Sequence, residues 1–295
     1  MRSMAIIGAG QMGKTISELI NLNQVKFIGF GDNDSRKWTK NAREGDRENI
    51  LYDFRCPVMP VEKAVAENPD SMIIGEIGKS RPESLARQVR DLGYKGTIHF
   101  ADDLHEDFDL RGRCISQIIR RIQENGIKGA AAELGVYKGD TAWRINALMP
   151  ERKMYLFDTF EGFDDRDVEK EKAGSLSKAV KGDFSDTSVE AVMKRFLFPE
   201  KIIVRKGFFP ETARGLEDER YAFVSMDPDL YDPVLSGLDY FYPRLSPGGC
   251  IVLHDYNNEQ FMGVKKAVED YEKIHGRLNI VPLGDFHGSC VIMKG

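Results

Sequence analysis

The chain twice repeats the order apolar run, glycine-rich turn and amphipathic stretch, and this order constrains its fold more than any other feature of its 295 residues. The first repeat opens at residues 4–22 and the second at 129–149. A strand that is followed by a helix pairs in parallel with the next strand, because the helix returns the chain to the same end of the sheet. The sequence therefore predicts an α/β protein of two doubly wound domains, a small N-terminal Rossmann-like unit and a larger C-terminal Rossmann-like sheet.

We place the domain boundary after residue 107. Residues 1–107 contain four predicted strands, and the acidic stretch 101–112 is expected to be a connector. The domain 108–295 opens with a helix near 114–125 and closes with two apolar runs after its last helix. These two runs predict an antiparallel edge on an otherwise parallel sheet.

The charge and the cysteines limit the class of partner. The formal net charge is -5, and neither domain has an excess of Lys and Arg, which argues against a nucleic-acid or membrane partner. No apolar run is long enough to cross a membrane, and no signal-peptide pattern precedes the first strand. The cysteines are scattered, as expected of reduced thiols in a cytoplasmic protein: Cys56, Cys114, Cys250 and Cys290. We expect a small-molecule partner and leave open whether the chain forms a homo-oligomer.

The N-terminal glycine motif has the context of a dinucleotide fingerprint. Gly8, Gly10 and Gly13 follow a strand and open a helix. Asp32 ends the second strand, 19 residues beyond Gly13. Backbone amides at such a turn can hold a phosphate, and the carboxylate can accept hydrogen bonds from ribose hydroxyls. These four residues are therefore a candidate nucleotide site, and a turn that binds nothing is the alternative.

Two further hypotheses concern the same motif. A nicotinamide-dependent oxidoreductase would need a lysine or a tyrosine–lysine pair facing the motif, and none is visible in residues 1–107. The domain also resembles the small N-terminal Rossmann units that precede sugar-modifying transferase domains. That resemblance implies a nucleotide or nucleotide-sugar ligand.

Four segments of the C-terminal domain carry a more specific pattern. They are ELGVYKGDTA at 133–142, LFDTFEGF at 156–163, MDPDLYDP at 226–233 with YPRLSPGG at 242–249, and HDYN at 254–257. In this order and spacing they resemble the macrocin O-methyltransferase (TylF-like) family of class I S-adenosylmethionine-dependent methyltransferases. The resemblance covers about the last 180 residues and leaves out the N-terminal domain. It implies an enzyme that methylates a hydroxyl group of a sugar, a glycoside or a related natural product.

The first two segments predict the cofactor site. Glu133 ends a strand, and Gly135 and Gly139 form a turn over which a cofactor can lie. S-adenosylmethionine carries an amino group and no phosphate, which suits the carboxylate of Glu133. Asp158 ends the next strand, where it can accept both ribose hydroxyls, and a helix N-cap is the alternative role. Further candidate cofactor contacts are Tyr137, Thr159, Phe160, Asp183, Phe184 and Asp227.

The last segments predict a cluster of acids. Asp227 and Asp229 follow one strand, and Asp255 follows the next, 28 residues after Asp227. The ends of neighbouring parallel strands face the same crevice. Carboxylates that close together repel unless a cation lies between them, which predicts a divalent cation such as Mg²⁺ beside the acceptor hydroxyl. Asp227, His254 and Asp255 are the candidate catalytic residues and metal ligands.

His254 is the point at which the chain departs from the family. The family's usual Asp-Asp-Tyr reads His-Asp-Tyr here. The histidine fits a metal ligand, a general base for the hydroxyl proton, or a support for other ligands. With His254 as a ligand, the site could bind Mn²⁺ or Zn²⁺ in place of Mg²⁺. Catalysis without a metal ion is a further alternative. A catalytically inactive nucleotide-binding or S-adenosylmethionine-binding protein is the remaining alternative. His287 and Tyr231 are further polar residues near predicted strand ends, and packing or a surface hydrogen bond is the alternative role for both.

One charged stretch, DDRDVEKEKAGSLSKAVK at 164–181, has two interpretations. It fits a solvated loop or helix, and it equally fits a mobile lid over a site. We expect the acceptor pocket to be built here and from residues after 257.

Overall fold

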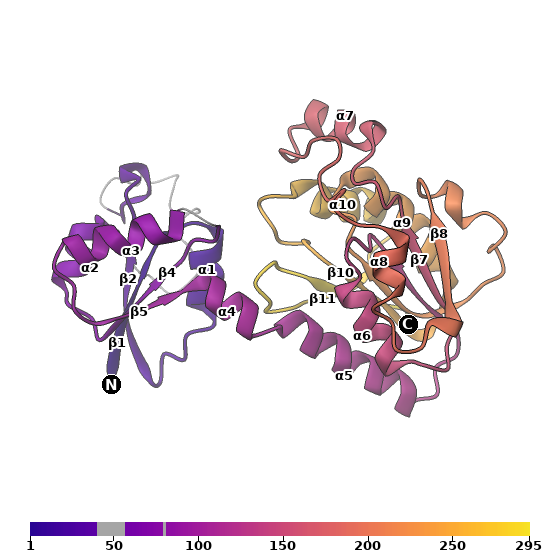
Figure 1. Ribbon diagram of the computed structural model, residues 1–295, viewed down its shortest axis with the longest axis horizontal. Coiled ribbons are helices and arrows are strands. Elements are labelled where there is room, and N and C mark those ends of the chain that lie inside the picture. Colours follow the sequence, from indigo (N-terminus) through magenta and orange to yellow (C-terminus); the bar gives the residue numbers. More distant parts are fainter. Residues whose placement is uncertain (40–56, 79–80) are drawn as a thin grey trace. The chain divides into compact units, whose positions relative to one another are not determined.

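The computed structural model describes residues 1–39, 57–78 and 81–295, which form two compact units (Figure 1). The N-terminal unit ends at Asp109, just beyond the boundary expected from the sequence. Each unit has a sheet and a hydrophobic core of its own. Within the described ranges, no helix is both long enough and apolar enough to cross a membrane.

The described residues of the N-terminal unit form a parallel sheet of five strands in the order β3-β2-β1-β4-β5. The strands are β1 (Arg2–Ile7), β2 (Val25–Gly31), β3 (Val58–Met59), β4 (Ser71–Ile74) and β5 (Thr97–Phe100). The helices are α1 (Gln11–Glu18), α2 (Val61–Ala66), α3 (Arg81–Asp91) and α4 (Ala101–Asp107). The core joins buried side chains of β1 and β4 to those of α2 and α3, including Ile7, Ile74 and Val89.

The expectation of an acidic connector at 101–112 is wrong, because its first seven residues form helix α4 and helix α5 begins at Leu110. Asp102 and Asp103 lie in the first turn of α4. Negative charge in a first turn is stabilised by the amide end of the helix dipole. The acidity that suggested a connector is therefore compatible with a helix.

The C-terminal unit has a seven-stranded sheet in the order β11-β12-β10-β9-β6-β7-β8. The strands are β6 (Ala130–Leu134), β7 (Met154–Asp158), β8 (Ile202–Lys206), β9 (Tyr221–Met226), β10 (Leu245–Leu253), β11 (Asn279–Pro282) and β12 (Cys290–Met293). Strands β6 to β10 run parallel, whereas β12 is antiparallel to both β10 and β11. The predicted α/β class and the antiparallel edge are thus confirmed.

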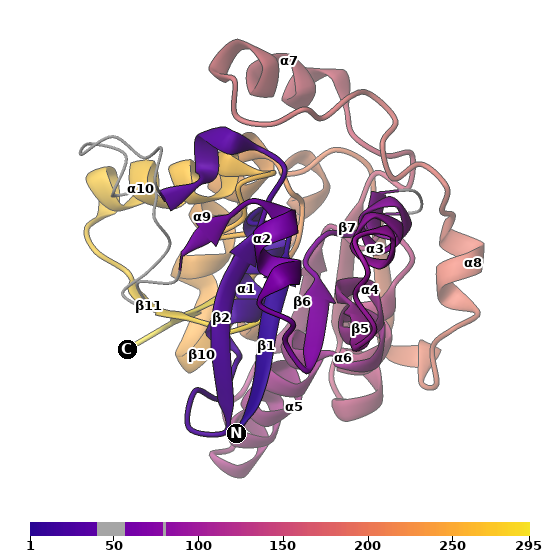
Figure 2. The same cartoon turned by 90° about the vertical axis from the view of Figure 1, so that its left-hand side faces the viewer.

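Helices cover both faces of this sheet. They are α5 (Leu110–Glu124), α6 (Asp140–Leu148), α7 (Asp165–Gly174), α8 (Val189–Met193), α9 (Tyr231–Arg244) and α10 (Met262–His275). Along β7, Tyr155 and Phe157 pack on the α9 and α10 side, while Met154 and Leu156 pack on the α5 and α6 side. A strand that is apolar on both faces is typical of a sheet covered on both sides. Helix α7, from the charged stretch, lies at the upper edge in both views (Figures 1 and 2).

Candidate active site

A cavity of about 380 Å³ lies in the C-terminal unit at the carboxyl ends of its parallel strands. This edge is where open α/β sheets bind their ligands. The predicted residues that line it are Glu133, Gly135, Tyr137, Asp158, Thr159, Phe184, Asp227, His254 and Asp255. The predicted residues outside its lining are Gly139, Phe160 and Asp183. The structure thus brings most of the candidate cofactor and catalytic residues of this unit to one place.

The turn after β6 requires glycine at position 135. Gly135 has φ +80°, and a Cβ atom there would lie 2.2 Å from the backbone oxygen of Asp227. Its N–H donates a hydrogen bond to the carbonyl of Phe157 at 3.0 Å. Gly139, with φ +77°, precedes α6, and a Cβ atom there would lie 2.8 Å from the side chain of Val192. Both glycines therefore permit close packing around the turn.

Asp158 anchors the same turn from the end of β7. Its Oδ2 accepts the N–H groups of Val136 and Tyr137 at 2.6 and 3.0 Å, and its Oδ1 accepts the N–H of Phe160 at 2.6 Å. A carboxylate has about four acceptor positions, so roughly one remains for a ligand. The helix N-cap alternative is wrong, because the next helix, α7, begins after its own cap at Asp164.

Aromatic rings form the wall beside this turn. Tyr137 and Phe184 pack edge to face with ring centroids 5.2 Å apart, and Phe163 packs in the same way on Phe184 at 5.2 Å. Phe184 is 41% exposed and lines the cavity. An accessible aromatic face of this kind can pack against a planar group of a ligand.

Three further candidates have contacts within the protein. The hydroxyl of Thr159 donates to the carbonyl of Gly162 at 2.7 Å, although the residue lines the cavity. Phe160 is 4% exposed and packs in the core on the α5 and α6 side. Asp183 accepts the N–H of Val180 at 3.0 Å. Phe160 and Asp183 therefore shape the loop around the cavity from outside its wall.

Glu133 is buried in β6 with one carboxyl oxygen unsatisfied. The residue is 2% exposed, and its Oε1 accepts the hydroxyl of Ser225 at 3.3 Å. Its Oε2 has no hydrogen-bond partner among the described residues. Burial, followed by the charge of Asp227, raises the pKa of Glu133 well above its ordinary value. A buried oxygen without a donor is costly, so this oxygen marks a position for a donor group of a ligand.

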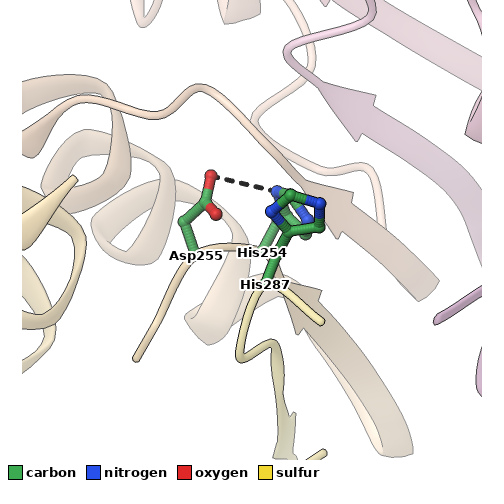
Figure 3. A group of neighbouring side chains, drawn as sticks. All are labelled: His254, Asp255 and His287. Carbon is green, nitrogen blue, oxygen red and sulfur yellow. Dashed lines mark ion pairs between the residues drawn. The ribbon is translucent and has the colours of Figure 1, made fainter. Parts of the chain in front are cut away.

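The ends of β9 and β10 bring Asp227, His254 and Asp255 together. Figure 3 shows His254 and Asp255 of this group with the neighbouring His287. His254 Nδ1 lies 2.7 Å from Asp227 Oδ1 and 3.0 Å from Asp255 Oδ2, and neither contact is aligned as a hydrogen bond. His254 Nε2 is buried and has no partner in the described part of the chain. With Asp229, these residues offer four ligand atoms that all lie within 4.8 Å of one another.

Two more residues complete this cluster. Arg111 in α5 donates from Nη1 to Asp227 Oδ2 at 2.7 Å, and no local sequence pattern marks it because Asp227 is 116 positions away. The ring centroid of His287 lies 5.1 Å from that of His254, and both residues line the cavity. His287, which the sequence places near a strand end, therefore lies beside the acids.

The charges in the cluster are set by burial and by one another. Burial favours a raised pKa for Asp227, but the cations His254 and Arg111 bring it below its ordinary value. Burial favours a lowered pKa for His254, but Asp227 and Asp255 raise it to about 10. Burial and the charges of Asp227 and Asp255 raise the pKa of Asp229 well above its usual range. At neutral pH two carboxylates are therefore balanced by an imidazolium and a guanidinium group.

Strained backbone concentrates at the cavity. Four non-glycine residues that line it have positive φ angles, namely Tyr137, Phe184, Asp229 and Asp255. This conformation costs about 1–2 kcal/mol at each such residue and persists only where surrounding structure fixes it. Because two of the four belong to the acid cluster, the strain helps to aim carboxylates into the cavity.

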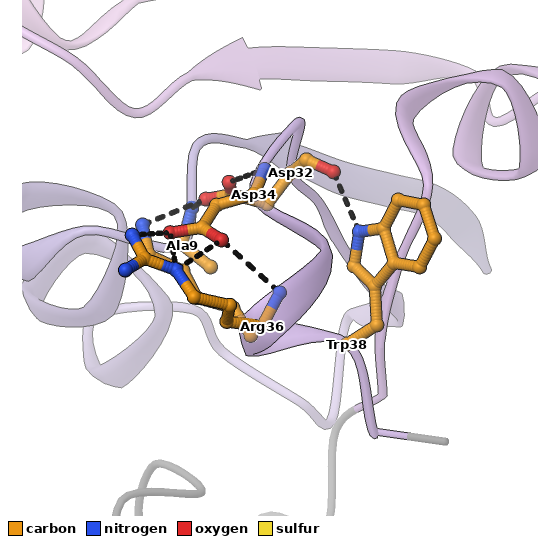
Figure 4. A network of polar contacts seen from close by, with 6 residues as sticks. Ala9, Asp32, Asp34, Arg36 and Trp38 are labelled. Atoms are coloured by element: carbon orange, nitrogen blue, oxygen red, sulfur yellow. Dashed lines mark hydrogen bonds and ion pairs between the residues drawn. The ribbon is translucent and has the colours of Figure 1, made fainter. Parts of the chain in front are cut away.

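The N-terminal glycine turn is held by Asp32. Its Oδ2 accepts the N–H of Ala9 at 2.7 Å and the ammonium group of Lys37 at 3.0 Å (Figure 4). Its Oδ1 accepts the N–H of Asp34 at 2.8 Å. Gly10 faces open space, and the other two glycines of the motif, Gly8 and Gly13, pack against each other. These contacts explain Gly8, Gly13 and Asp32 without a ligand but leave Gly10 unexplained, and a nucleotide site at this turn stays a prediction.

The C-terminal unit matches a known family. The sequence profile of the macrocin-O-methyltransferase (TylF) family covers residues 109–294. The chain belongs to this family. The resemblance inferred from the sequence is thereby confirmed, and the C-terminal unit is an S-adenosylmethionine-dependent O-methyltransferase.

Several relatives are similar at low identity. The 8-demethyl-8-(2,3-dimethoxy-alpha-L-rhamnosyl)-tetracenomycin-C 4'-O-methyltransferase of Streptomyces olivaceus is 26% identical over 192 residues, 60% of this chain and 69% of that enzyme. The mycinamicin III 3''-O-methyltransferase of Micromonospora griseorubida is 27% identical over 175 residues, 55% of this chain and 66% of that enzyme. The demethyldecarbamoylnovobiocin O-methyltransferase of Streptomyces niveus is 26% identical over 245 residues, 79% and 89% of the two chains.

A solved structure has the same fold as this macrocin-O-methyltransferase family member. The O-methyltransferase NovP superposes with a TM-score of 0.53 at 21% identity, over 62% of this chain and 79% of its own. The likeness supports the Rossmann-like fold.

Gly135→Ala should destabilise the C-terminal unit far more than Gly215→Ala. The two glycines have φ angles of +80° and +82°, but only a Cβ atom at 135 meets another atom within 4 Å. We expect a loss of about 1–2 kcal/mol in the free energy of unfolding for Gly215→Ala and at least about 3 kcal/mol for Gly135→Ala, measured by urea denaturation. Equal losses would contradict the close approach of the turn to Asp227.

Proposed function

We propose that this enzyme transfers a methyl group from S-adenosylmethionine to a hydroxyl group of a sugar or glycoside acceptor. One observation carries the proposal: the glycine turn after β6 and the acid cluster after β9 and β10 line one cavity. A cofactor on the turn would thus lie beside an acceptor at the acids. The name of the Streptomyces olivaceus relative specifies a rhamnosyl compound, which supports a sugar-bearing acceptor.

The cofactor half of the site would be built by the turn and the ends of β6 and β7. S-adenosylmethionine would supply a methyl group on a sulfonium centre: the acceptor oxygen would bond to the methyl carbon as the carbon–sulfur bond breaks, with S-adenosylhomocysteine as the leaving group and the hydroxyl proton released. Glu133 Oε2, which lacks a donor, would accept a hydrogen bond from the amino group of the cofactor. The remaining acceptor position of Asp158 would accept a hydrogen bond from a ribose hydroxyl. Asp158 would bind one ribose hydroxyl, not both, as long as it keeps its three hydrogen bonds to backbone N–H groups. Phe184 would pack on the adenine side of the cavity.

The acid cluster suits a divalent cation. Its donors are carboxylate oxygens and one imidazole nitrogen, and His254 Nδ1 lies between two carboxylates without hydrogen-bond alignment. We infer that Asp227, His254 and Asp255 would hold the ion, which would lower the pKa of the acceptor hydroxyl and position its oxygen. The imidazole ligand would admit Mn²⁺ or Zn²⁺ as well as Mg²⁺.

His254 is better suited to a ligand than to a general base. In the cluster without an ion, the two carboxylates keep its proton, with a pKa of about 10. An imidazolium at neutral pH cannot take the hydroxyl proton. A bound cation would displace that proton, and the nitrogen would then hold the ion.

Transfer of a labelled methyl group from S-adenosylmethionine to a panel of rhamnosides and other glycosides tests the proposed function. The unmodified enzyme should methylate at least one member. Asp227→Asn should lower kcat by about a hundredfold or more, since the charge that organises the cluster is lost, while calorimetry should find cofactor affinity largely kept. Asp239→Asn, an exposed acid of α9, is the matched control and should leave both values unchanged. No methylated sugar, or full activity in Asp227→Asn, would refute the proposal.

Removal of metal should abolish turnover. After treatment with EDTA and desalting, we expect less than about a tenth of the initial rate, restored by Mg²⁺ or Mn²⁺. Replacing the nitrogen donor by a carboxylate in His254→Asp should shift the preference toward Mg²⁺, because harder cations prefer oxygen ligands. Full activity of the metal-free enzyme would show that the cluster works without an ion.

A further inference from the structure

Helix α7 buries two acids although most of its residues are charged. Asp167, Val168 and Glu171 are 8%, 2% and 1% exposed. Val168 belongs to the core on the α9 and α10 side of the sheet, which explains its burial. A carboxyl group is seldom buried without a partner, so Asp167 and Glu171 each need a separate explanation.

Glu171 fastens α7 to the start of α9. Its Oε1 accepts the N–H of Tyr231, the first residue of α9, at 2.7 Å. A carboxylate at the amide end of a helix is stabilised by the helix dipole. Beside it, Lys170 forms an ion pair with Asp232 at 2.5 Å. These contacts fix α7 in place and satisfy one carboxyl oxygen of Glu171, whereas its Oε2 is buried without a hydrogen-bond partner among the described residues.

Asp167 has no such partner. It lines the cavity, and it makes no hydrogen bond or ion pair with any residue that the structure describes. The neighbouring cations are engaged elsewhere: Arg166 pairs with Asp164 at 2.9 Å, and Lys170 pairs with Asp232. Asp167 is therefore a residue that is more than nine-tenths buried and that lines the cavity without a hydrogen-bond donor for its carboxyl group.

The carboxyl group of Asp167 destabilises the folded state when it is ionised. Burial, Asp232 and Asp164 raise the pKa of Asp167 to about 7, while Arg166 and Lys170 partly oppose the shift. An ionisable group that is perturbed in this way and makes no hydrogen bond or ion pair with the described residues is typical of a binding site.

Asp167 belongs to the acceptor side of the cavity. Helix α7 packs on α9, which follows the acid cluster, and Ser177 beyond α7 bridges to Phe261 before α10. Phe261 and Gln260 line the same cavity, as does Leu230 before α9. These segments are distinct from the glycine turn after β6, where the cofactor is proposed to lie.

We propose that Asp167 is an acceptor-recognition residue whose carboxyl group accepts a hydrogen bond from a hydroxyl or protonated amino group of the acceptor, away from the oxygen that is methylated. The proposal rests on the proposed function. It assigns to α7 the choice of acceptor, because the helix is fixed by Glu171 and places at the cavity a carboxyl group that has no hydrogen-bond partner among the described residues.

A stability measurement tests this assignment without an acceptor. A group with a pKa of about 7 when folded and an ordinary lower pKa when unfolded destabilises the folded state as pH rises from about 4 to 7. Asp167→Asn removes this penalty, so its melting temperature should exceed that of the unmodified enzyme by roughly 3–6 °C at pH 8 and by less at pH 5. Glu169→Gln, on the exposed face of the same helix, should shift neither value. A lower melting temperature for Asp167→Asn at both pH values would make Asp167 a structural residue and overturn the assignment.

A kinetic measurement separates this assignment from the proposed function. With a glycoside found in the panel above, Asp167→Ala should raise KM for that acceptor about tenfold or more, because no oxygen acceptor remains at this position, with cofactor affinity unchanged and Glu169→Ala as the control. Asp167→Asn distinguishes the two donors: its amide oxygen still accepts from a hydroxyl group, so KM should rise only for a glycoside that donates from an ammonium group. An active enzyme with unchanged KM in Asp167→Ala would refute the role of Asp167 and leave the proposed function standing. An unmodified enzyme that methylates no glycoside would refute the proposed function, and this role with it.

Discussion

A row of backbone hydrogen bonds joins the carboxyl ends of the five parallel strands in the C-terminal unit, and the site depends on it. The bonds run from the N–H groups of Gly207, Gly135, Asp227 and His254 to the carbonyl groups of Asp158, Phe157, Leu134 and Met226, at 2.9, 3.0, 2.8 and 2.9 Å. Each bond extends the pairing of two strands by one residue beyond the sheet. Because the backbone is fixed at this edge, the side chains that leave it are held at defined positions around one cavity.

Asp158 and Asp227 both lie at this edge of the sheet, but their carboxylates have different partners. This difference separates a cofactor side of the cavity from an acceptor side. Asp158 accepts three backbone N–H groups and so holds the glycine turn in shape. Asp227 is contacted by two cationic side chains, Arg111 and His254, at 2.7 Å each. The first environment suits a neutral hydroxyl of a cofactor, whereas the second can exchange a proton for a metal ion. The proposed cofactor and acceptor sides follow from this contrast.

The sequence predicts the features of the fold and the site that follow from the order of strands and helices along the chain. Alternating strands and helices give the parallel sheets, and the neighbouring strand ends bring Asp227 and Asp255 into one cluster. It does not predict Arg111, because the contact joins a helix to a strand end 116 positions away and leaves no local pattern. Nor does it single out Asp167 among the acids of α7, because only packing decides which face of so polar a helix is buried.

The two units use an acid at the end of the second strand in the same way. Asp32 and Asp158 each accept N–H groups from the glycine turn of the preceding strand. The contact therefore belongs to the architecture of the turn, and it is no evidence for a ligand by itself. In the C-terminal unit the unsatisfied oxygen of Glu133 is the additional observation that points to a bound cofactor.

A crystal structure with S-adenosylhomocysteine tests the central claim most directly. We expect the ligand in the cavity of the C-terminal unit, with its amino nitrogen at hydrogen-bond distance from Glu133 Oε2 and a ribose hydroxyl at Asp158. Density for the ligand at the N-terminal glycine turn, or in the cavity with its amino group away from Glu133, would contradict the account.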